Sequence, residues 1–208
     1  MTQVEFYFDC SSPWTYLAFH NIRPLADEFE FEIIWRPILV GGIFNAVNPS
    51  VYESRKTGVP AKQAYMVKDL ADWAALARLK ILFPPGVFPV NSVKAMRGCI
   101  WLAPQGLLVP FAESVFHAYW SEDRDISRDE ELALICDRIG IDTAAFFAGI
   151  AAPTIKDELR FNTEQVITRG GFGSPTYFLG DDMYFGNDRL PVLIEAIKRQ
   201  RRKQSPAA

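Results

Sequence analysis

The sequence is poor in the two residue types that most metal and redox sites require. Its 208 residues include only three cysteines and two histidines. Cys10, Cys99 and Cys136 are widely separated, so there is neither a disulfide framework nor a Cys-x-x-Cys pair. His20 and His117 do not have the His-x-x-x-His spacing of a helical zinc site. These absences exclude a structural zinc centre in practice, and we expect no metal.

The sequence also has no excess of basic residues and no long hydrophobic run. Twenty-two basic residues against twenty-five acidic ones give a net charge of −3, which gives no reason to expect nucleic acid or an anionic membrane as a partner. The most apolar stretches are well short of the roughly 20 residues that span a bilayer. The first residues lack the basic segment of a secretory signal. We therefore expect a cytoplasmic protein whose partners are small molecules.

The first part of the chain has a strand, helix and strand pattern. Residues 4–9 are aromatic and β-branched, which is typical of a buried strand. Ser12 is a candidate N-cap, followed by Pro13 in the first turn, for a helix that reaches about Glu28. Residues 31–35 predict a second strand, so the chain opens as β-α-β.

The middle of the chain, residues 39–154, has almost no strand signal. Clusters of glycine and proline, among them Gly41-Gly42, separate the segments with helical periodicity. This pattern predicts an all-helical layer, with helices near residues 62–79, 92–102, 111–120, 129–139 and 143–147.

The last part of the chain returns to strands. A helix over residues 154–168 precedes a glycine-rich loop and Ser174-Pro175, and residues 176–185 have a hairpin pattern with an Asp-rich turn. A final helix is expected from Arg189 to about Arg199. The order of elements predicts an α/β protein with a thioredoxin-like domain, residues 1–38 and 155–208. An inserted all-α domain, residues 39–154, interrupts it.

The residues at the start of the first predicted helix resemble a known motif. Disulfide oxidoreductases of the thioredoxin superfamily carry Cys-Pro-x-Cys there, whereas this chain has Ser12-Pro13-Trp14-Thr15, so dithiol exchange is unavailable. With this change, residues 6–17 resemble the 2-hydroxychromene-2-carboxylate isomerases and the related kappa-class glutathione transferases. The likeness extends over nearly the whole chain through Arg36-Pro37, Gly41-Gly42-Ile43, Asn48-Pro49, Lys62 with Tyr65-Met66, 116–120, 173–176 and 186–190.

The resemblance implies that glutathione is the cofactor. Ser12 would be the catalytic residue, because its hydroxyl and the helix N-terminus favour a thiolate that it orients without attacking. Ser11 is the rival, since the family usually has an apolar residue there, and Cys10 is interpreted as a core residue. Pro175 would be a cis-proline, and only the backbone of Ser174 would bind, so the absence of the family's usual Val or Leu would matter little. The implied glutathione-binding residues are Ser12, Asn48, Lys62, Ser174, Pro175, Asn187, Asp188 and Arg189.

The sequence leaves three functions open. The first is a glutathione-dependent isomerase acting on an aromatic carboxylate from aromatic catabolism by reversible thiolate addition, and the second is a kappa-class-like transferase. The third is a binding module that has lost its cysteines. The family also implies a homodimer. Trp73, Phe83, Phe88 and Trp120 are candidates for an aromatic pocket, although aromatic residues at helical spacing are more often core.

Overall fold

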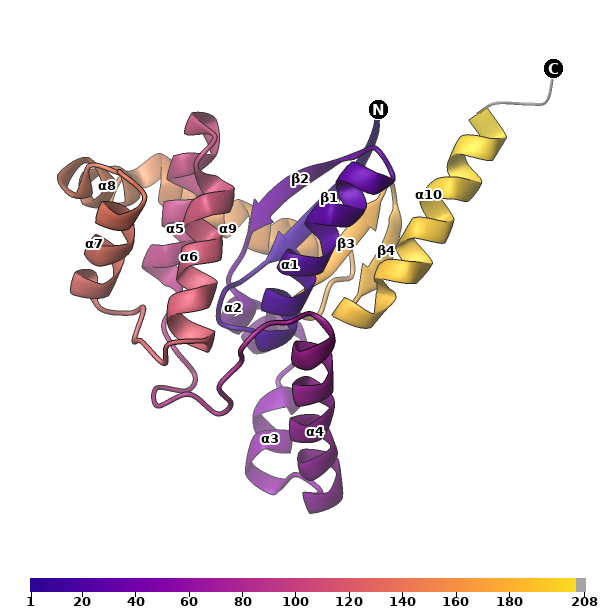
Figure 1. The fold of residues 1–208 in the computed structure, drawn as a ribbon, viewed down its shortest axis with the longest axis horizontal. Helices are drawn as coiled ribbons and strands as arrows, with labels where there is room; N and C mark the ends of the chain where they lie inside the picture. Colours follow the sequence, from indigo (N-terminus) through magenta and orange to yellow (C-terminus); the bar gives the residue numbers. More distant parts are fainter. Residues whose placement is uncertain (205–208) are drawn as a thin grey trace.

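A four-stranded sheet forms the centre of the molecule (Figure 1). The computed structural model describes residues 1–204, apart from the side chains of residues 54–56 and 204, so residues 205–208 of the predicted first domain lie outside the described part. The strand order is β2-β1-β3-β4, with β1 parallel to β2 and antiparallel to β3. The strands are β1 (Thr2–Phe8), β2 (Phe31–Pro37), β3 (Thr176–Leu179) and β4 (Asp182–Phe185).

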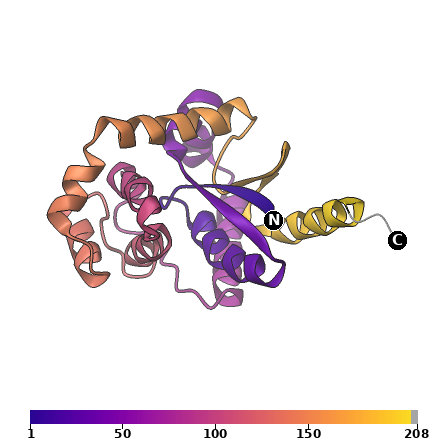
Figure 2. The same cartoon turned by 90° about the horizontal axis from the view of Figure 1, so that it is seen from above.

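Alternation along the strands assigns side chains to two faces of the sheet. Phe6, Phe8 and Tyr177 belong to the large core cluster, which includes residues of α1 (Pro13–Glu28) and α10 (Leu190–Gln204). Tyr7 and Phe178 belong to a smaller cluster with residues of α2 (Val40–Val47) and α9 (Pro153–Thr168). Seen from above, the sheet lies between α1 and α9 (Figure 2). The two central strands, β1 and β3, are therefore buried on both faces over most of their length, as their aromatic sequence indicates, whereas the edge strand β4 is partly exposed.

The described strands all lie within residues 1–38 and 155–208, and helices fill the middle, so the predicted fold class is confirmed. Buried residues of α5, α6 and α7 share one continuous core cluster with the sheet. The division into two domains thus stays a prediction. The middle elements are α3 (Ser50–Thr57), α4 (Pro60–Leu76), α5 (Val93–Leu102), a 3-10 turn (Ala103–Gln105), α6 (Leu108–Trp120), α7 (Asp129–Arg138) and α8 (Thr143–Ile150).

Two details of the expected elements are wrong. Gly41-Gly42 does not separate helices but lies inside α2. A Cβ on Gly42 would lie 3.3 Å from Thr163 Cγ2 of α9, so the small residue lets the two helices approach closely. The last helix begins at Leu190 rather than Arg189, because Asn187–Arg189 forms a separate 3-10 turn.

Helices α3 and α4 form a hairpin that extends away from the sheet (Figure 1). Leu70 and Ala74 are the buried residues of α4, whereas Tyr65, Met66 and Val67 are exposed. The wide apolar face of this helix therefore lies mostly at the surface. Within residues 1–204, no helix is long and apolar enough to cross a membrane.

Candidate active site

Ser12 lies at the N-terminus of α1, directly beyond the end of β1. Its backbone is extended, with φ −112° and ψ 126°, and its Oγ accepts a hydrogen bond from Thr15 N at 3.3 Å, as an N-cap does. Pro13 follows in the first turn, which contains no acidic residue. Ser12 is half-buried, so its hydroxyl lies at the positive end of a 16-residue helix where an anion is stabilised.

The loop before β3 faces this helix end. The Ser174–Pro175 peptide bond is cis, as the resemblance implied. Ser12 Oγ donates to the carbonyl oxygen of Ser174 at 3.4 Å, and Pro175 O accepts a hydrogen bond from Gly186 N at 3.1 Å. The cis-proline loop therefore joins the start of α1 to the 3-10 turn before α10.

The hydroxyl of Ser174 has a structural role that the backbone-only expectation did not include. It lies 2.8 Å from Thr15 Oγ1 and accepts a hydrogen bond from Asp9 N at 3.2 Å. Both hydroxyls are buried. The loop is thus fixed against β1 and α1 by the side chain of Ser174 as well as by its backbone.

Asp9 is a buried carboxylate beside the site that is not among the residues predicted from the sequence. Its Oδ1 accepts Ser11 N at 2.9 Å, and its Oδ2 accepts Val40 N at 2.8 Å. Burial raises the pKa of Asp9, while these hydrogen bonds to the carboxylate oppose the rise. An acidic residue closing an otherwise aromatic buried strand was the signal that could have pointed to it.

The two residues before Ser12 make different contacts from those of Ser12. Ser11 donates its N–H to Asp9 Oδ1 at 2.9 Å. Cys10 is 1% exposed, and burial raises the pKa of its thiol well above the ordinary value. A buried neutral thiol is unreactive, so the interpretation of Cys10 as a core residue agrees with its position.

The γ-glutamyl candidates lie close to the cis-proline loop. Asn187 is buried, and its Oδ1 accepts a hydrogen bond from Asn21 Nδ2 at 3.0 Å. Its own Nδ2 is buried without an acceptor among the described residues. Asp188 and Arg189 are half-exposed and form an ion pair of 2.5 Å with each other. This turn thus offers one unused buried donor and two accessible charges.

The two predicted binding residues from the helical region, Asn48 and Lys62, differ in their position relative to the site. Asn48, at the end of α2, donates through Nδ2 to Phe172 O at 3.1 Å and accepts Ser50 Oγ at 2.8 Å, so it holds the loop that leads to Pro175. Lys62 is an exposed residue near the start of α4, at the end of the hairpin that is farther from the sheet (Figure 1). The structure thus brings Asn48 to the site, and it does not bring Lys62 there.

A model of the DsbA-like thioredoxin domain matches residues 3–198 of this chain, nearly its full length. The chain belongs to the DsbA-like thioredoxin family. Within that family it falls with the 2-hydroxychromene-2-carboxylate isomerases. The enzyme of that name from Pseudomonas sp. (strain C18) is 31% identical over 194 residues, which are 93% of this chain and 89% of the relative.

Other relatives of this DsbA-like protein are transferases. Human glutathione S-transferase kappa 1 is 26% identical over 208 residues, covering 93% of this chain and 90% of the relative. A solved structure of 2-hydroxychromene-2-carboxylate isomerase superposes with a TM-score of 0.82 and 29% identity over 97% of both chains. A probable DsbA oxidoreductase from Streptomyces coelicolor superposes with a TM-score of 0.76 at 18% identity, which shows a common fold alone.

An aromatic cluster adjoins the candidate site of this DsbA-like domain. Phe83, Phe88 and Trp120 have ring centroids 5.5 to 6.4 Å apart. Trp120 is fully buried, and its Nε1 donates to Cys10 O at 2.8 Å, whereas Phe88 is 36% exposed. Three of the four aromatic pocket candidates therefore lie together, and one of them, Trp120, contacts Cys10, which precedes Ser12 by two residues. Trp73 lies on α4, half-buried.

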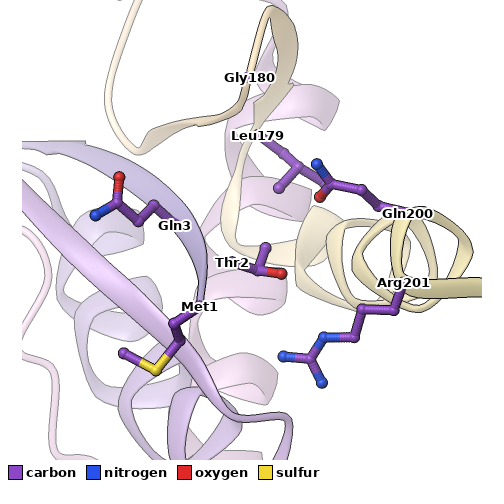
Figure 3. Close-up of a pocket in the computed structure, with 7 residues that line it drawn as sticks. All are labelled: Met1, Thr2, Gln3, Leu179, Gly180, Gln200 and Arg201. Carbon is purple, nitrogen blue, oxygen red and sulfur yellow. The ribbon is translucent and has the colours of Figure 1, made fainter. Parts of the chain in front are cut away.

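A pocket of about 400 Å³ lies at the other end of the sheet, where β1 begins (Figure 3). None of the predicted site residues lines it, and Ser12 follows the opposite end of β1. Residues of β1, the β3–β4 turn and α10 surround it: Met1, Thr2, Gln3, Leu179, Gly180, Gln200 and Arg201. It therefore does not mark the candidate active site.

Proposed function

We propose that this protein is a glutathione-dependent isomerase of the 2-hydroxychromene-2-carboxylate isomerase type. The observation that carries the proposal is Ser12, a half-buried hydroxyl at the N-terminus of α1 facing the carbonyl of a cis-proline loop, where disulfide oxidoreductases have a cysteine. A site with this geometry and no thiol of its own suits a thiolate brought by a cofactor.

The residues present fit glutathione. Asn187 Nδ2 is a buried donor that no described residue uses, and such a group gains by meeting an acceptor. Asp188 is accessible to the ammonium group and Arg189 to the carboxylate of the γ-glutamyl end. The backbone of Ser174 would hold the cysteinyl part beside Pro175. Asn48 would act through the loop that it fixes, and Lys62 is proposed from the resemblance alone.

Each residue has a defined task in this proposal. Glutathione, when bound, supplies a thiolate that adds reversibly to a conjugated double bond, allows rotation about it and leaves again. Ser12 Oγ donates a hydrogen bond to the sulfur, and the first-turn N–H groups and the helix dipole stabilise its charge. Ser12 must exchange its present acceptor, Ser174 O at 3.4 Å, for that sulfur. The 3.4 Å bond is long, so little is lost in the exchange.

The proposed substrate is a planar aromatic carboxylate. Phe88 and Phe83 present aromatic surface next to the buried Trp120, close to the segment that carries Ser12. Stacking on such surface orients a flat molecule. The relatives named after 2-hydroxychromene-2-carboxylate act on a substrate of this class, and this supports the assignment.

A homodimer and a cytoplasmic location are part of the proposal. Tyr65, Met66 and Val67 on α4 are 37 to 65% exposed, and a second copy would bury such an apolar face. Light scattering during size-exclusion chromatography would find a mass of about twice 23.5 kDa if the proposal holds.

One experiment separates the isomerase from the alternatives. The protein is incubated with catalytic glutathione and 2-hydroxychromene-2-carboxylate, and both isomer formation and free thiol are followed. Isomer formation at constant thiol supports the isomerase. Loss of thiol with an electrophile such as a chloronitrobenzene indicates a transferase, which the similarity to kappa-class enzymes makes the second candidate. Failure to bind millimolar glutathione would leave a binding module.

A further inference from the structure

Asp9 contacts three separate segments around the candidate site. Through its carboxylate it accepts the N–H of Ser11 at 2.9 Å and that of Val40, in the first turn of α2, at 2.8 Å. Its own N–H donates to Ser174 Oγ at 3.2 Å, and its carbonyl accepts Ser12 N at 3.3 Å. One residue thus joins the start of α1, the start of α2 and the cis-proline loop.

We propose that Asp9 is the positioning residue of this site, which sets the place of Ser12 relative to the cis-proline loop. Asp9 is 1% exposed, so it cannot touch a bound ligand itself. Its carboxylate is stabilised in the interior by N–H donors, and such charge-assisted hydrogen bonds are short and directional. The consequence for catalysis rests on the proposed function.

The arrangement explains why a carboxylate, and not an amide, stands at this position. Both oxygens accept a backbone N–H. An asparagine has the same shape but would point its NH₂ group at one of these two donors. Asp9→Asn therefore releases either the turn before Ser12 or the start of α2, with little change in volume.

A purely electrostatic role makes the opposite prediction for a bound thiol. A negative charge near a thiolate raises the pKa of the thiol, so removing the charge would lower that pKa. If Asp9 acts by positioning, its loss takes the Ser12 hydroxyl away from the sulfur, and the pKa of the thiol rises. The direction of the change therefore distinguishes positioning from charge.

The test compares Asp9→Asn with a matched control, Asp142→Asn. Asp142 caps α8 by accepting Ala145 N at 3.0 Å, in the helical region away from Ser12 (Figure 1). In Asp9→Asn we expect the thiol pKa of saturating glutathione, followed at 240 nm, to rise. We also expect kcat to fall about 10-fold to 100-fold, the scale reached when a preorganised group is misplaced. Asp142→Asn should behave as wild type. An unchanged or lowered thiol pKa in Asp9→Asn overturns the inference.

Two further measurements test the inference if glutathione does not bind or if Asp9→Asn does not fold. At least one of the amide protons of Ser11 and Val40 should lose hydrogen-exchange protection in Asp9→Asn, and both should keep it in Asp142→Asn. Protection retained at both amides of Asp9→Asn overturns the inference whether or not glutathione binds. Wild-type protein whose bound thiol titrates like free glutathione instead contradicts the proposed function. If Asp9→Asn does not fold, Ser92→Ala removes a buried hydroxyl that lowers the pKa of the Asp9 carboxyl. It should raise the thiol pKa in the same direction by less, and no change overturns the inference.

Discussion

The hydroxyl of Thr15 lies 2.8 Å from that of Ser174, across the interface between the first turn of α1 and the cis-proline loop. Thr15 stands where the Cys-Pro-x-Cys motif of disulfide oxidoreductases has its second cysteine, and the resemblance to the isomerases implies an apolar residue at the position of Ser174. Both hydroxyls are buried, so the Thr15 hydroxyl finds its partner in Ser174, whose Oγ also accepts Asp9 N at 3.2 Å.

Ser174→Val should destabilise the protein, although the resemblance implies Val or Leu at this position. It leaves the Thr15 hydroxyl and Asp9 N–H without their partner, and an unsatisfied buried polar group costs about 1 to 3 kcal/mol. Urea denaturation of wild type, Ser174→Val, Thr15→Val and the double variant measures the coupling, which we expect to exceed about 0.5 kcal/mol. Additive effects would mean that the two hydroxyls do not interact.

Ser12→Ala should lower turnover by about 100-fold or more, the scale of losing one preorganised donor to an anion. Glutathione affinity should fall much less, because most of the cofactor would be held elsewhere. Since the hydroxyl also caps α1, Ser12→Gly serves as a second variant that retains most of the cap's stability. Both should lose activity equally, and Ser11→Ala should be milder. A larger loss in Ser11→Ala would place the function on the neighbouring residue.

The ion pairs of Glu5 with Arg36 and Arg169 predict that the protein loses stability in acid. Burial opposes the ionisation of Glu5, but hydrogen bonds and charge from Arg169 and Arg36 outweigh it and hold the pKa below the ordinary value of 4.5. A lowered pKa in the folded state contributes stability above pH 4.5, and this contribution disappears as the pH falls through the folded-state pKa. Thermal unfolding of Glu5→Gln and wild type is compared between about pH 3 and 7, a range that includes the titration of carboxyl groups. At about pH 7 the variant should be less stable than wild type. The difference should shrink toward pH 3, and a constant difference would contradict this assignment.

The sequence predicted the elements whose signals are local. Ser12 and Pro13 located the start of α1, and the Asp-rich turn located the β3–β4 hairpin. The prediction at Gly41-Gly42 was wrong because glycine more often ends a helix than continues it. Here the close approach of α2 to Thr163 of α9 explains a small residue inside the helix. The roles of Asp9 and Ser174 were missed for a similar reason. Their partners, Val40 and Thr15, come from other elements, and no pattern along the chain shows which distant N–H or hydroxyl a buried group will meet.

The ionisation of bound glutathione is the prediction on which the proposed function depends most directly. A fall in thiol pKa from about 9 to about 7 represents nearly 3 kcal/mol of preferential stabilisation of the thiolate. A helix dipole alone supplies about 0.3 to 1 kcal/mol at an exposed site, so the Ser12 hydroxyl and the first-turn N–H groups must supply the rest. Absorbance at 240 nm, titrated with saturating glutathione, should give a thiol pKa near 7 in wild type and a clearly higher one in Ser12→Ala. Equal values in the two proteins, both close to that of free glutathione, would remove the chemical basis shared by the isomerase and the transferase and favour a binding module.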